Sequence, residues 1–311
     1  MSWRDGVHLT GTPIWCDARR RRDICFLSSA YRAGRSGHSQ LIATATTLAL
    51  IGASDKGHLA VPLRQRFTLG TVRLELIPSG RGFGAAALYA DITGRTVLYA
   101  GAVRTTAGGA GEAGEVRTSD AVVVAAPYGE THHRFPPLAT AIEAAIAWTR
   151  AQLAADRRPV LLVDSLLDGL EVASRLAAEA IAVAGSRALR EAGQRIAALV
   201  PPIGAPGREP RAIVWLDADR GGLARSLGDR GFATALVSAR ASIDAAGYDA
   251  GFAWATAADR AQLLGWIEST GARDVFVTGA CAEAIVAAIG AGARVIGPPH
   301  QMSLFPGEAL P

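Results

Sequence analysis

The pattern of apolar residues changes at Pro136-Pro137, and this change limits the folds that are open to the chain. Before the two prolines, short apolar runs alternate with glycine-rich turns, as in residues 72–77, 86–92 and 121–126, and this pattern is typical of β-strands. After them, runs with helical spacing alternate with apolar runs such as residues 159–163 and 212–216, which indicates βα units. A strand-rich first part followed by βα units predicts an α/β protein with partly parallel strand pairing.

Three connecting segments are assigned from their local composition. Residues 41–51 are rich in alanine and leucine and precede Gly52, which predicts a short helix that ends there. Residues 105–114 are rich in glycine and alanine without an apolar period, and we interpret them as a mobile loop. The run Arg19-Arg20-Arg21-Arg22 joins two predicted strands. We interpret it first as a solvated hairpin, with phosphate binding as the alternative.

Composition excludes several classes of protein. The chain has 311 residues, 50% hydrophobic and 19% charged, which allows a large core in one bilobed unit or two packed domains. Its three cysteines are not spaced for disulfides, so we expect a reducing, cytoplasmic environment. No uninterrupted apolar stretch has the length of a bilayer, so no membrane partner is expected. The net charge of +4 comes almost wholly from arginine and is compatible with nucleic acid.

The segment Ser28-Ser29-Ala30-Tyr31-Arg32-Ala33-Gly34 follows the apolar run of residues 24–27. It resembles the Ser-His-x-His-x-Asp-His segment with which metallo-β-lactamase-fold hydrolases begin their metal site. Ser28 matches the leading serine, but the ligand positions hold Ser29, Tyr31, Ala33 and Gly34. None of these side chains is an imidazole or a carboxylate, the ligands that such a site requires.

Five further segments resemble the ligase-associated DNA/RNA-exonuclease branch of this family, in its order along the chain. They are residues 78–86, 96–102, 122–129, 251–259 and 275–280. In that branch they read Pro-Ala-Gly-His-x-x-Gly-Ser-Ala, a strand ending in Gly-Asp, Thr-Glu-Ala-Thr-Phe-Gly, Phe-x-Leu-Ser-Asp-His-Ala-Asp and Val-x-Val-Thr-His-Gly. At the ligand positions this chain carries Arg81, Ala102, Ala257 and Gly279. Ala125 stands at the acid of the third segment, and only Asp259 remains of the polar set.

The resemblance implies a fold and a lost activity. The implied fold is an αββα four-layer metallo-β-lactamase-like sandwich of residues 1–140 and 245–298, with a β-CASP-like βα lobe at 141–244 and an extended tail at 299–311. Active members are two-metal phosphodiesterases, which need imidazole and carboxylate ligands to fix the cations and activate a bridging water. Arg81 would bring a permanent positive charge to the place of a cation. We therefore expect no metal, no cofactor and no catalysis.

A glycine motif in the same region needs a separate interpretation. Gly80-Arg81-Gly82-Phe83-Gly84-Ala85 formally matches the dinucleotide fingerprint Gly-x-Gly-x-x-Ala. That fingerprint must open a helix whose N-terminus holds the pyrophosphate. The residues that follow are typical of a strand and a turn, so we exclude nucleotide binding here.

The tail carries a motif of its own. Gln301-Met302-Ser303-Leu304-Phe305 lies between Pro299 and Pro306, and flanking prolines favour an extended, accessible peptide. The five residues resemble the Gln-Leu-Ser/Asp-Leu-Phe peptide by which bacterial replication and repair proteins bind the DNA sliding clamp. In that mode Leu304 and Phe305 enter an apolar pocket and Gln301 hydrogen-bonds its rim. The alternative is a tail that packs on its own domain.

These features predict a catalytically inactive, exonuclease-like adaptor in bacterial DNA repair. Its expected partner is the sliding clamp, with weak DNA contact through Arg81 and the arginine run as an addition. Three alternatives stay open. They are an inactive subunit paired with an active nuclease paralogue, an active nuclease whose metal site lies elsewhere, and a nucleic-acid-binding module without a protein partner.

Overall fold

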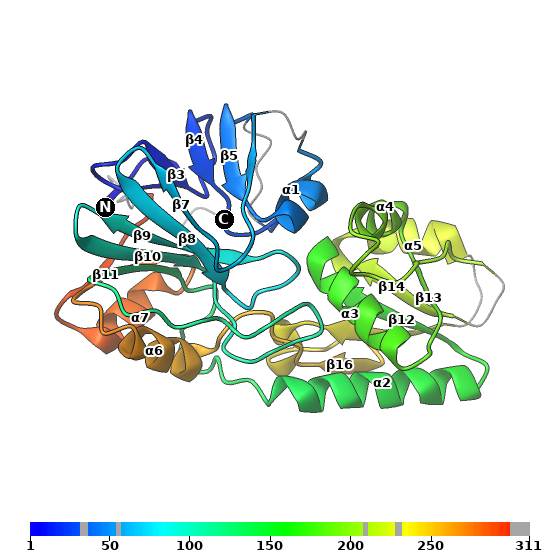
Figure 1. The fold of residues 1–311 in the computed structure, drawn as a ribbon. Helices are drawn as coiled ribbons and strands as arrows, with labels where there is room; N and C mark the ends of the chain where they lie inside the picture. The colour runs from blue at the N-terminus through cyan, green and yellow to red at the C-terminus, as the bar shows by residue number, and fades with distance from the viewer. Residues whose placement is uncertain (32–36, 54–56, 208–210, 228–231, 299–311) are drawn as a thin grey trace, which may run out of the picture.

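The computed structural model describes residues 1–31, 37–53, 57–207, 211–227 and 232–298 (Figure 1). Within these ranges, three β-sheets and their helices form a mixed α/β protein, as the sequence pattern predicts. In Figure 1 the first two sheets lie together on the left, and the third sheet lies with its helices on the right.

The first sheet is built from the N-terminal segment. Its strand order is β1-β2-β3-β4-β5-β6. Pairing is antiparallel from β1 to β3 and parallel from β3 to β6. The strands are β1 (Ser2–Trp3), β2 (Val7–His8), β3 (Ile14–Cys16), β4 (Ile24–Phe26), β5 (Gln40–Ala43) and β6 (Leu59–Ala60).

The second sheet takes strands from both halves of the chain. Its order is β18-β17-β11-β10-β9-β8-β7. It is antiparallel from β7 to β10 and parallel from β10 to β18. The strands are β7 (Arg66–Leu69), β8 (Val72–Pro78), β9 (Ala86–Ile92), β10 (Arg95–Gly101), β11 (Ala121–Ala125), β17 (Asp274–Thr278) and β18 (Ala293–Val295).

The first two sheets bury one face against each other. Because side chains alternate along a strand, Phe26 and Ile42 of the first sheet point inward, in one cluster with Leu76 and Leu88 of the second. Phe26 also packs edge-on against Tyr99, with the ring centroids 6.0 Å apart. Burying each such side chain contributes roughly 1.5–3 kcal/mol, so this apolar layer holds the two sheets together.

Helices pack on part of the outer face of each of these two sheets. Leu48 of the helix on the first sheet packs with Cys25 and Leu41. Trp266 and Ile285 belong to the two helices on the second sheet and pack on its strands. These helices are α1 (Ala45–Ile51) on the first sheet, and α6 (Arg260–Ser269) and α7 (Ala282–Ile289) on the second.

The prediction of a helix at residues 41–51 is wrong for its first four residues. Residues 41–43 belong to β5, where Leu41 pairs with Cys25 of β4 inside the sheet. The helix begins after Thr44, whose hydroxyl accepts a hydrogen bond from the Thr47 N–H at 3.1 Å and so caps it. It ends at Gly52 with a φ of 66°, the end that the sequence predicts.

The third sheet forms a separate lobe whose five described strands all pair in parallel, in the order β13-β14-β12-β15-β16. This confirms the parallel pairing predicted for the second part of the chain. The strands are β12 (Arg158–Val163), β13 (Val183–Gly185), β14 (Ala212–Leu216), β15 (Phe232–Val237) and β16 (Ala250–Phe252). One face carries α2 (Leu138–Ala154), α3 (Leu166–Ala178) and α4 (Arg187–Arg195), and the other carries α5 (Arg220–Leu227). Short 3-10 turns follow β14 and β15, η1 (Asp217–Asp219) and η2 (Ala239–Ser242).

The lobe extends past its expected boundary at residue 244, because β16 reaches Phe252 and pairs with β15. The lobe also shares a core cluster with the first two sheets. Leu50 of α1 and Phe83 pack in this cluster with Leu170 of α3. Arg195 of α4 donates a hydrogen bond to the Leu50 carbonyl at 2.9 Å. These contacts fix the lobe against the sheets.

Candidate functional site

Two positions that resemble ligand sites and one that resembles the acid of another segment come together at one end of the second sheet. Ala102 follows β10, Ala125 ends β11, and Ala257 lies just before α6. The three alanines form a buried cluster, with Tyr128 packed against it. They are 3–6% exposed, so this alanine cluster is buried and presents only methyl groups.

Arg81 and Tyr31 form a second group of such positions. The guanidinium carbon of Arg81 lies 4.4 Å from the centre of the Tyr31 ring, a cation–π contact. The Tyr31 hydroxyl donates a hydrogen bond to Asp168 in α3, and the Ser165 hydroxyl donates to the same carboxylate at 2.7 Å. Burial raises the pKa of both the Tyr31 hydroxyl and the Asp168 carboxyl. Tyr31 thus connects the first sheet's side of the site to the lobe.

Tyr128 packs on the alanine cluster, and the charge of Arg81 acts on the pKa of its hydroxyl. Burial raises the pKa of its hydroxyl to about 12, Asp164 acts in the same direction, and Arg81 opposes the shift. Its ring packs edge-on against Phe135 at 4.9 Å between centroids. At neutral pH the phenol is therefore protonated and does not offer an anionic ligand.

Two further positions that resemble ligand sites, Ser29 and Gly279, also offer no metal ligand. Ser29 is buried, with 3% of its surface exposed. At Gly279 a Cβ atom would lie 2.9 Å from the carbonyl oxygen of Ala126, so a side chain there would press on the backbone beside the alanine cluster. Ala33 and Gly34 lie outside the described residues.

The donors present do not fit a metal centre. Among the described residues, no group of three or more His, Cys, Asp or Glu side chains is placed to hold a metal ion. Asp164 accepts hydrogen bonds from Arg240, the shortest 2.6 Å, and Asp168 accepts one from Tyr31. Asp259, the one acid that matches the family's pattern, accepts a 2.9 Å hydrogen bond from a backbone N–H in the first turn of α6. Its role here is to cap a helix.

The carboxyl edge of the third sheet carries polar residues that sequence reasoning missed. Asp164 follows β12, Asp217 follows β14 and Ser238 follows β15. Arg240 bridges the two aspartates, with N–O distances of 2.6 and 3.0 Å. The helices after β12 and β14 lie on opposite faces of the sheet, and parallel sheets bind ligands at such switch points. The sequence did carry a signal for this group, because a polar residue directly follows each of three apolar strands.

A buried ion pair joins the lobe to the second sheet. Arg104 and Glu171 are 2% and 1% exposed, and their closest nitrogen and oxygen are 2.8 Å apart. The Gly109 N–H also donates to Glu171, at 3.2 Å. Burial raises the pKa of Glu171, and Arg104 opposes this shift. The loop of residues 105–114 packs closely over the pair, since a Cβ at Gly108 would lie 2.2 Å from Nη2 of Arg104. The interpretation of this loop as mobile is therefore wrong.

A cysteine and a histidine that lie close together do not form a nucleophile and its base. The sulfur of Cys281 is 3.8 Å from Nδ1 of His133. That nitrogen already accepts hydrogen bonds from the N–H groups of Gly129 and Glu130, both at 3.1 Å. Burial also raises the pKa of the Cys281 thiol, which lowers the fraction of reactive thiolate.

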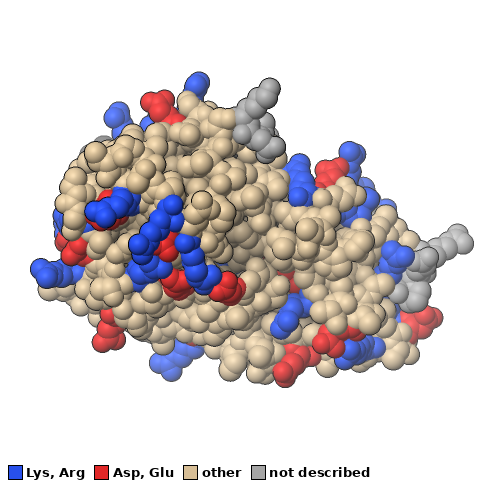
Figure 2. Space-filling view, in the orientation of Figure 1, with Lys and Arg blue, Asp and Glu red and all other residues tan. Residues whose placement is uncertain are grey.

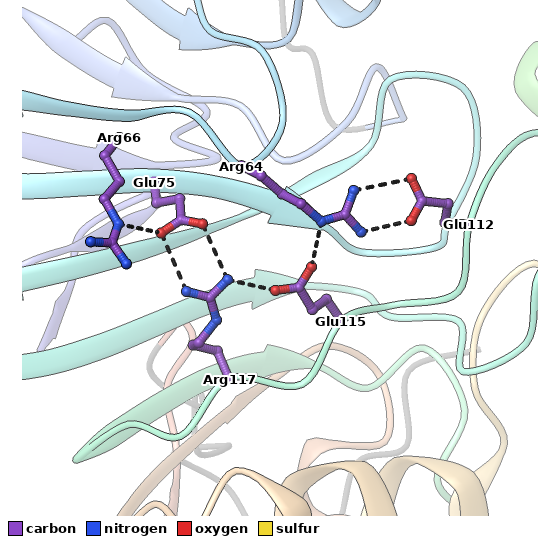
Figure 3. Close-up of polar contacts among 6 residues, drawn as sticks. All are labelled: Arg64, Arg66, Glu75, Glu112, Glu115 and Arg117. Atoms are coloured by element: carbon purple, nitrogen blue, oxygen red, sulfur yellow. Dashed lines mark hydrogen bonds and ion pairs between the residues drawn. The ribbon is translucent and has the colours of Figure 1, made fainter.

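The uncovered part of the second sheet carries a chain of alternating charges, with arginine and acidic side chains intermixed on the surface (Figures 2 and 3). Successive members pair at N–O distances of 2.6–3.3 Å. They are, in order, Arg66, Glu75, Arg117, Glu115, Arg64 and Glu112. A groove of about 480 Å³ beside them is lined by residues of β7 to β10, among them Tyr89 and Asp91. Because each of these arginines has a carboxylate partner, this face offers little net charge to a polyanion.

The arginine run connects β3 and β4 of the first sheet and takes no part in the alanine cluster. β3 and β4 are parallel neighbours, with Ile14 opposite Ile24. The connection between them therefore returns the chain along the sheet, and the interpretation as a hairpin is wrong. Nothing in the sequence indicates this pairing, because parallel and antiparallel neighbours share the same alternation of apolar residues.

The clamp-like residues 301–305 lie outside the described residues. In the ranges that the structure describes, no helix combines the length and apolar character needed to cross a membrane. No protein-family model matches the sequence, and no curated protein matches it.

Proposed function

We propose that this chain is a catalytically inactive relative of the metallo-β-lactamase-fold exonucleases that serves as an adaptor in DNA repair and docks on the sliding clamp. One observation carries the first half of this proposal. Ala102 and Ala257 stand at positions that resemble metal ligands, Ala125 stands at the acid of a third segment, and the three meet in one cluster. A chance resemblance in three segments would give no reason for their side chains to touch.

The arrangement of layers supports the same relationship. α1, the first sheet, the second sheet and the pair α6 and α7 follow one another in that order (Figure 1). We propose that these four layers are the αββα sandwich of the family, and that the parallel third sheet is its inserted lobe.

The chemistry of the site supports loss of catalysis. Hydrolysis by two metal ions needs anionic and imidazole ligands around a bridging water. Methyl groups at Ala102, Ala125 and Ala257 cannot bind cations, and the guanidinium of Arg81 repels them. The three alanines are also buried, and their methyl groups offer no hydrogen bond to hold the water that the reaction consumes.

The tail supports the adaptor role. Gln301, Leu304 and Phe305 occupy the anchor positions of the clamp-binding peptide. Anchors of this type carry most of the binding energy of an interface, so a short peptide suffices for docking.

Metal binding gives the first test. Protein treated with chelator and then dialysed against Zn²⁺ or Mn²⁺ is expected to hold no stoichiometric ion, because the ligand positions lack donors. Elemental mass spectrometry measures the content, and cleavage of end-labelled DNA measures activity. One or two bound ions per chain together with metal-dependent cleavage would show an active nuclease with a relocated site.

Clamp binding gives the second test. The variant Gln301→Ala, Leu304→Ala, Phe305→Ala is expected to bind purified clamp at least about 100-fold more weakly, because two anchors worth about 2 kcal/mol each are removed. The matched control is Gly307→Ala, Glu308→Ala, Leu310→Ala, three changes in the same tail outside the motif. Surface plasmon resonance compares the three proteins.

Equal binding by the intact chain and the motif variant would end the clamp proposal. If the chain instead purifies with an active nuclease paralogue, and deletion of residues 299–311 leaves that complex intact, the inactive-subunit alternative is correct.

A further inference from the structure

The parallel pairing of β3 and β4 places the arginine run across the outer face of the first sheet. The chain leaves β3 at Cys16 and must return to the start of β4 at Ile24. On the way Ala18 is buried in the outer-face cluster with Cys25 and Leu27. The arginines that follow therefore lie over a sheet face rather than at the tip of a turn.

A second segment locks this connection in place and adds a fifth arginine. The turn between β1 and β2 contains Arg4, and the N–H of Arg19 donates to the Asp5 carbonyl at 2.6 Å. The guanidinium of Arg22 donates to the Arg4 carbonyl. A Cβ at Gly6 would lie 2.5 Å from the Cα of Ala18, so the two segments are in direct backbone contact. We call the side chains of Arg4, Arg19, Arg20, Arg21 and Arg22 the basic loop surface.

This surface carries unbalanced positive charge. Residues 1–31 contain five arginines and three aspartates, a net charge of +2. One of these acids, Asp17, points away from the surface and is hydrogen-bonded by Ser28 and Tyr99 at 2.6 and 2.8 Å. Within the part of the chain that the structure describes, Arg4, Arg19 and Arg21 are exposed and have no carboxylate partner.

The remaining exposed arginine has a partner that a phosphate can replace. Arg20 pairs with Asp5 at 3.1 Å, with side chains 78% and 41% exposed. An ion pair so open to water is weak and screened by salt. The ion pair with Asp5 holds Arg20 beside the other arginines, and a phosphate can still bind to the Arg20 guanidinium.

The aromatic residue of this surface cannot stack on a base. The guanidinium carbon of Arg22 lies 3.9 Å from the centre of the Trp15 ring. His8 stacks on Trp15 at 4.6 Å between centroids and an angle of 24°. Arg22 and His8 therefore both cover the Trp15 ring. Among the described residues of this surface, Trp15 cannot serve as the base-stacking platform that single-strand binders use.

Apolar anchors for a protein partner are also missing from this surface. The exposed large hydrophobic residues of the described chain are Val116, Leu199, Ile243 and Val295, none of them in residues 1–31. Protein interfaces need an apolar centre, whereas phosphate backbones are bound by arginine forks alone. The chemistry therefore favours a polyphosphate over an acidic protein.

We propose that the basic loop surface binds the phosphate backbone of nucleic acid, without reading its sequence. The five arginines belong neither to the alanine cluster nor to the motif of residues 301–305, so this proposal goes beyond the proposed docking on the clamp. An adaptor with both contacts would hold DNA and clamp at the same time.

The test compares two variants of equal charge. Arg19→Gln, Arg20→Gln, Arg21→Gln removes three arginines from the surface. Arg150→Gln, Arg157→Gln, Arg187→Gln removes three exposed arginines from the lobe. Fluorescence anisotropy with a labelled duplex of mixed sequence measures affinity over a range of salt concentrations, and circular dichroism checks that both variants are folded.

The loop variant is expected to bind DNA about 10- to 100-fold more weakly at low salt, and its slope of log K against log salt is expected to flatten by about 2–3, since each phosphate contact contributes about 0.9. The lobe variant should bind like the unchanged protein. The substitution of the three loop arginines by lysine should retain most of the binding, which separates charge from fold.

Several outcomes would overturn the proposal. Equal weakening in the loop and lobe variants would mean that overall charge, and no particular surface, attracts DNA. Unchanged binding in both would place the DNA contact elsewhere. Stronger competition by polyglutamate than by unlabelled DNA would identify an acidic protein as the partner. Clamp binding by the loop variant should stay unchanged, so failure here leaves the clamp proposal standing.

Discussion

The Glu171→Gln variant is expected to lose about 3–5 kcal/mol of its free energy of unfolding. The substitution keeps the volume of the side chain but leaves Arg104 buried at 2% exposure without a counter-charge, and a lost partner of a buried ion pair costs about this much. Urea denaturation measures the change. Because Glu171 lies in α3 and Arg104 follows β10, hydrogen exchange in residues 105–114 should also accelerate.

The residue that follows the C-terminal end of α3 provides the control. Glu179 pairs with Arg150 on the surface, at 2.7 Å and with both side chains about half exposed. Exposed pairs contribute about 0–1 kcal/mol, so Glu179→Gln should have little effect. A cost below about 1 kcal/mol for Glu171→Gln would show that the buried pair does not hold the lobe.

A double variant distinguishes the contribution of the ion pair from the cost of leaving one buried charge without a partner. In Arg104 the Nε and Nη2 atoms are buried without a hydrogen-bond partner among the described residues, so this pair is incompletely satisfied. Replacing both residues by apolar ones, Arg104→Met and Glu171→Leu, should recover most of the lost stability, because such replacements are often neutral or stabilising. A double variant as unstable as Glu171→Gln would contradict this account.

The Gly80→Ala variant is expected to lose about 2–5 kcal/mol of its free energy of unfolding. Gly80 has a φ of 78°, and an added Cβ would lie 2.2 Å from the carbonyl oxygen of Arg104 and 2.7 Å from the nitrogen of Gly114. The left-handed conformation costs an alanine about 1–2 kcal/mol. The overlap with rigid backbone adds about 1–3 kcal/mol. Thermal or urea denaturation measures the sum.

Gly94→Ala isolates the conformational part of that loss. Gly94 has a φ of 87° but no described atom within 4 Å of an added Cβ, so this variant should lose only about 1–2 kcal/mol. Equal losses in the two variants would mean that the contact with Arg104 is not tight. The comparison also explains the glycine motif, since Gly80 serves packing and the strand β9 follows the motif, as the sequence predicts.

The sequence predicted those elements whose evidence is local. The apolar runs at residues 86–92 and 212–216 became β9 and β14 with unchanged bounds, because alternation and flanking turns identify a strand without reference to its neighbours. The helix end at Gly52 was predicted for the same reason. The resemblance singled out Ala102, Ala125 and Ala257 from the sequence alone, and their side chains lie in one cluster.

The errors arose where distant residues decide the structure. Residues 41–43 join a strand because β4 offers them a buried pairing partner, and their composition alone fits a helix equally well. The loop of residues 105–114 is held by Glu171, a residue that lies more than fifty positions along the chain. Its glycines, which suggest flexibility in isolation, are the residues that allow close contact with Arg104.

The burial of the alanine cluster has a consequence for the evolution of a chain with the function proposed above. A carboxylate introduced alone at Ala102, Ala125 or Ala257 would be an unpaired charge in an apolar enclosure, and the penalty would fall on folding before any cation was captured. A metal site at this cluster would therefore need several simultaneous replacements, each harmful by itself. Under the proposed function, this barrier would make a return to hydrolysis less accessible than a change of binding partner.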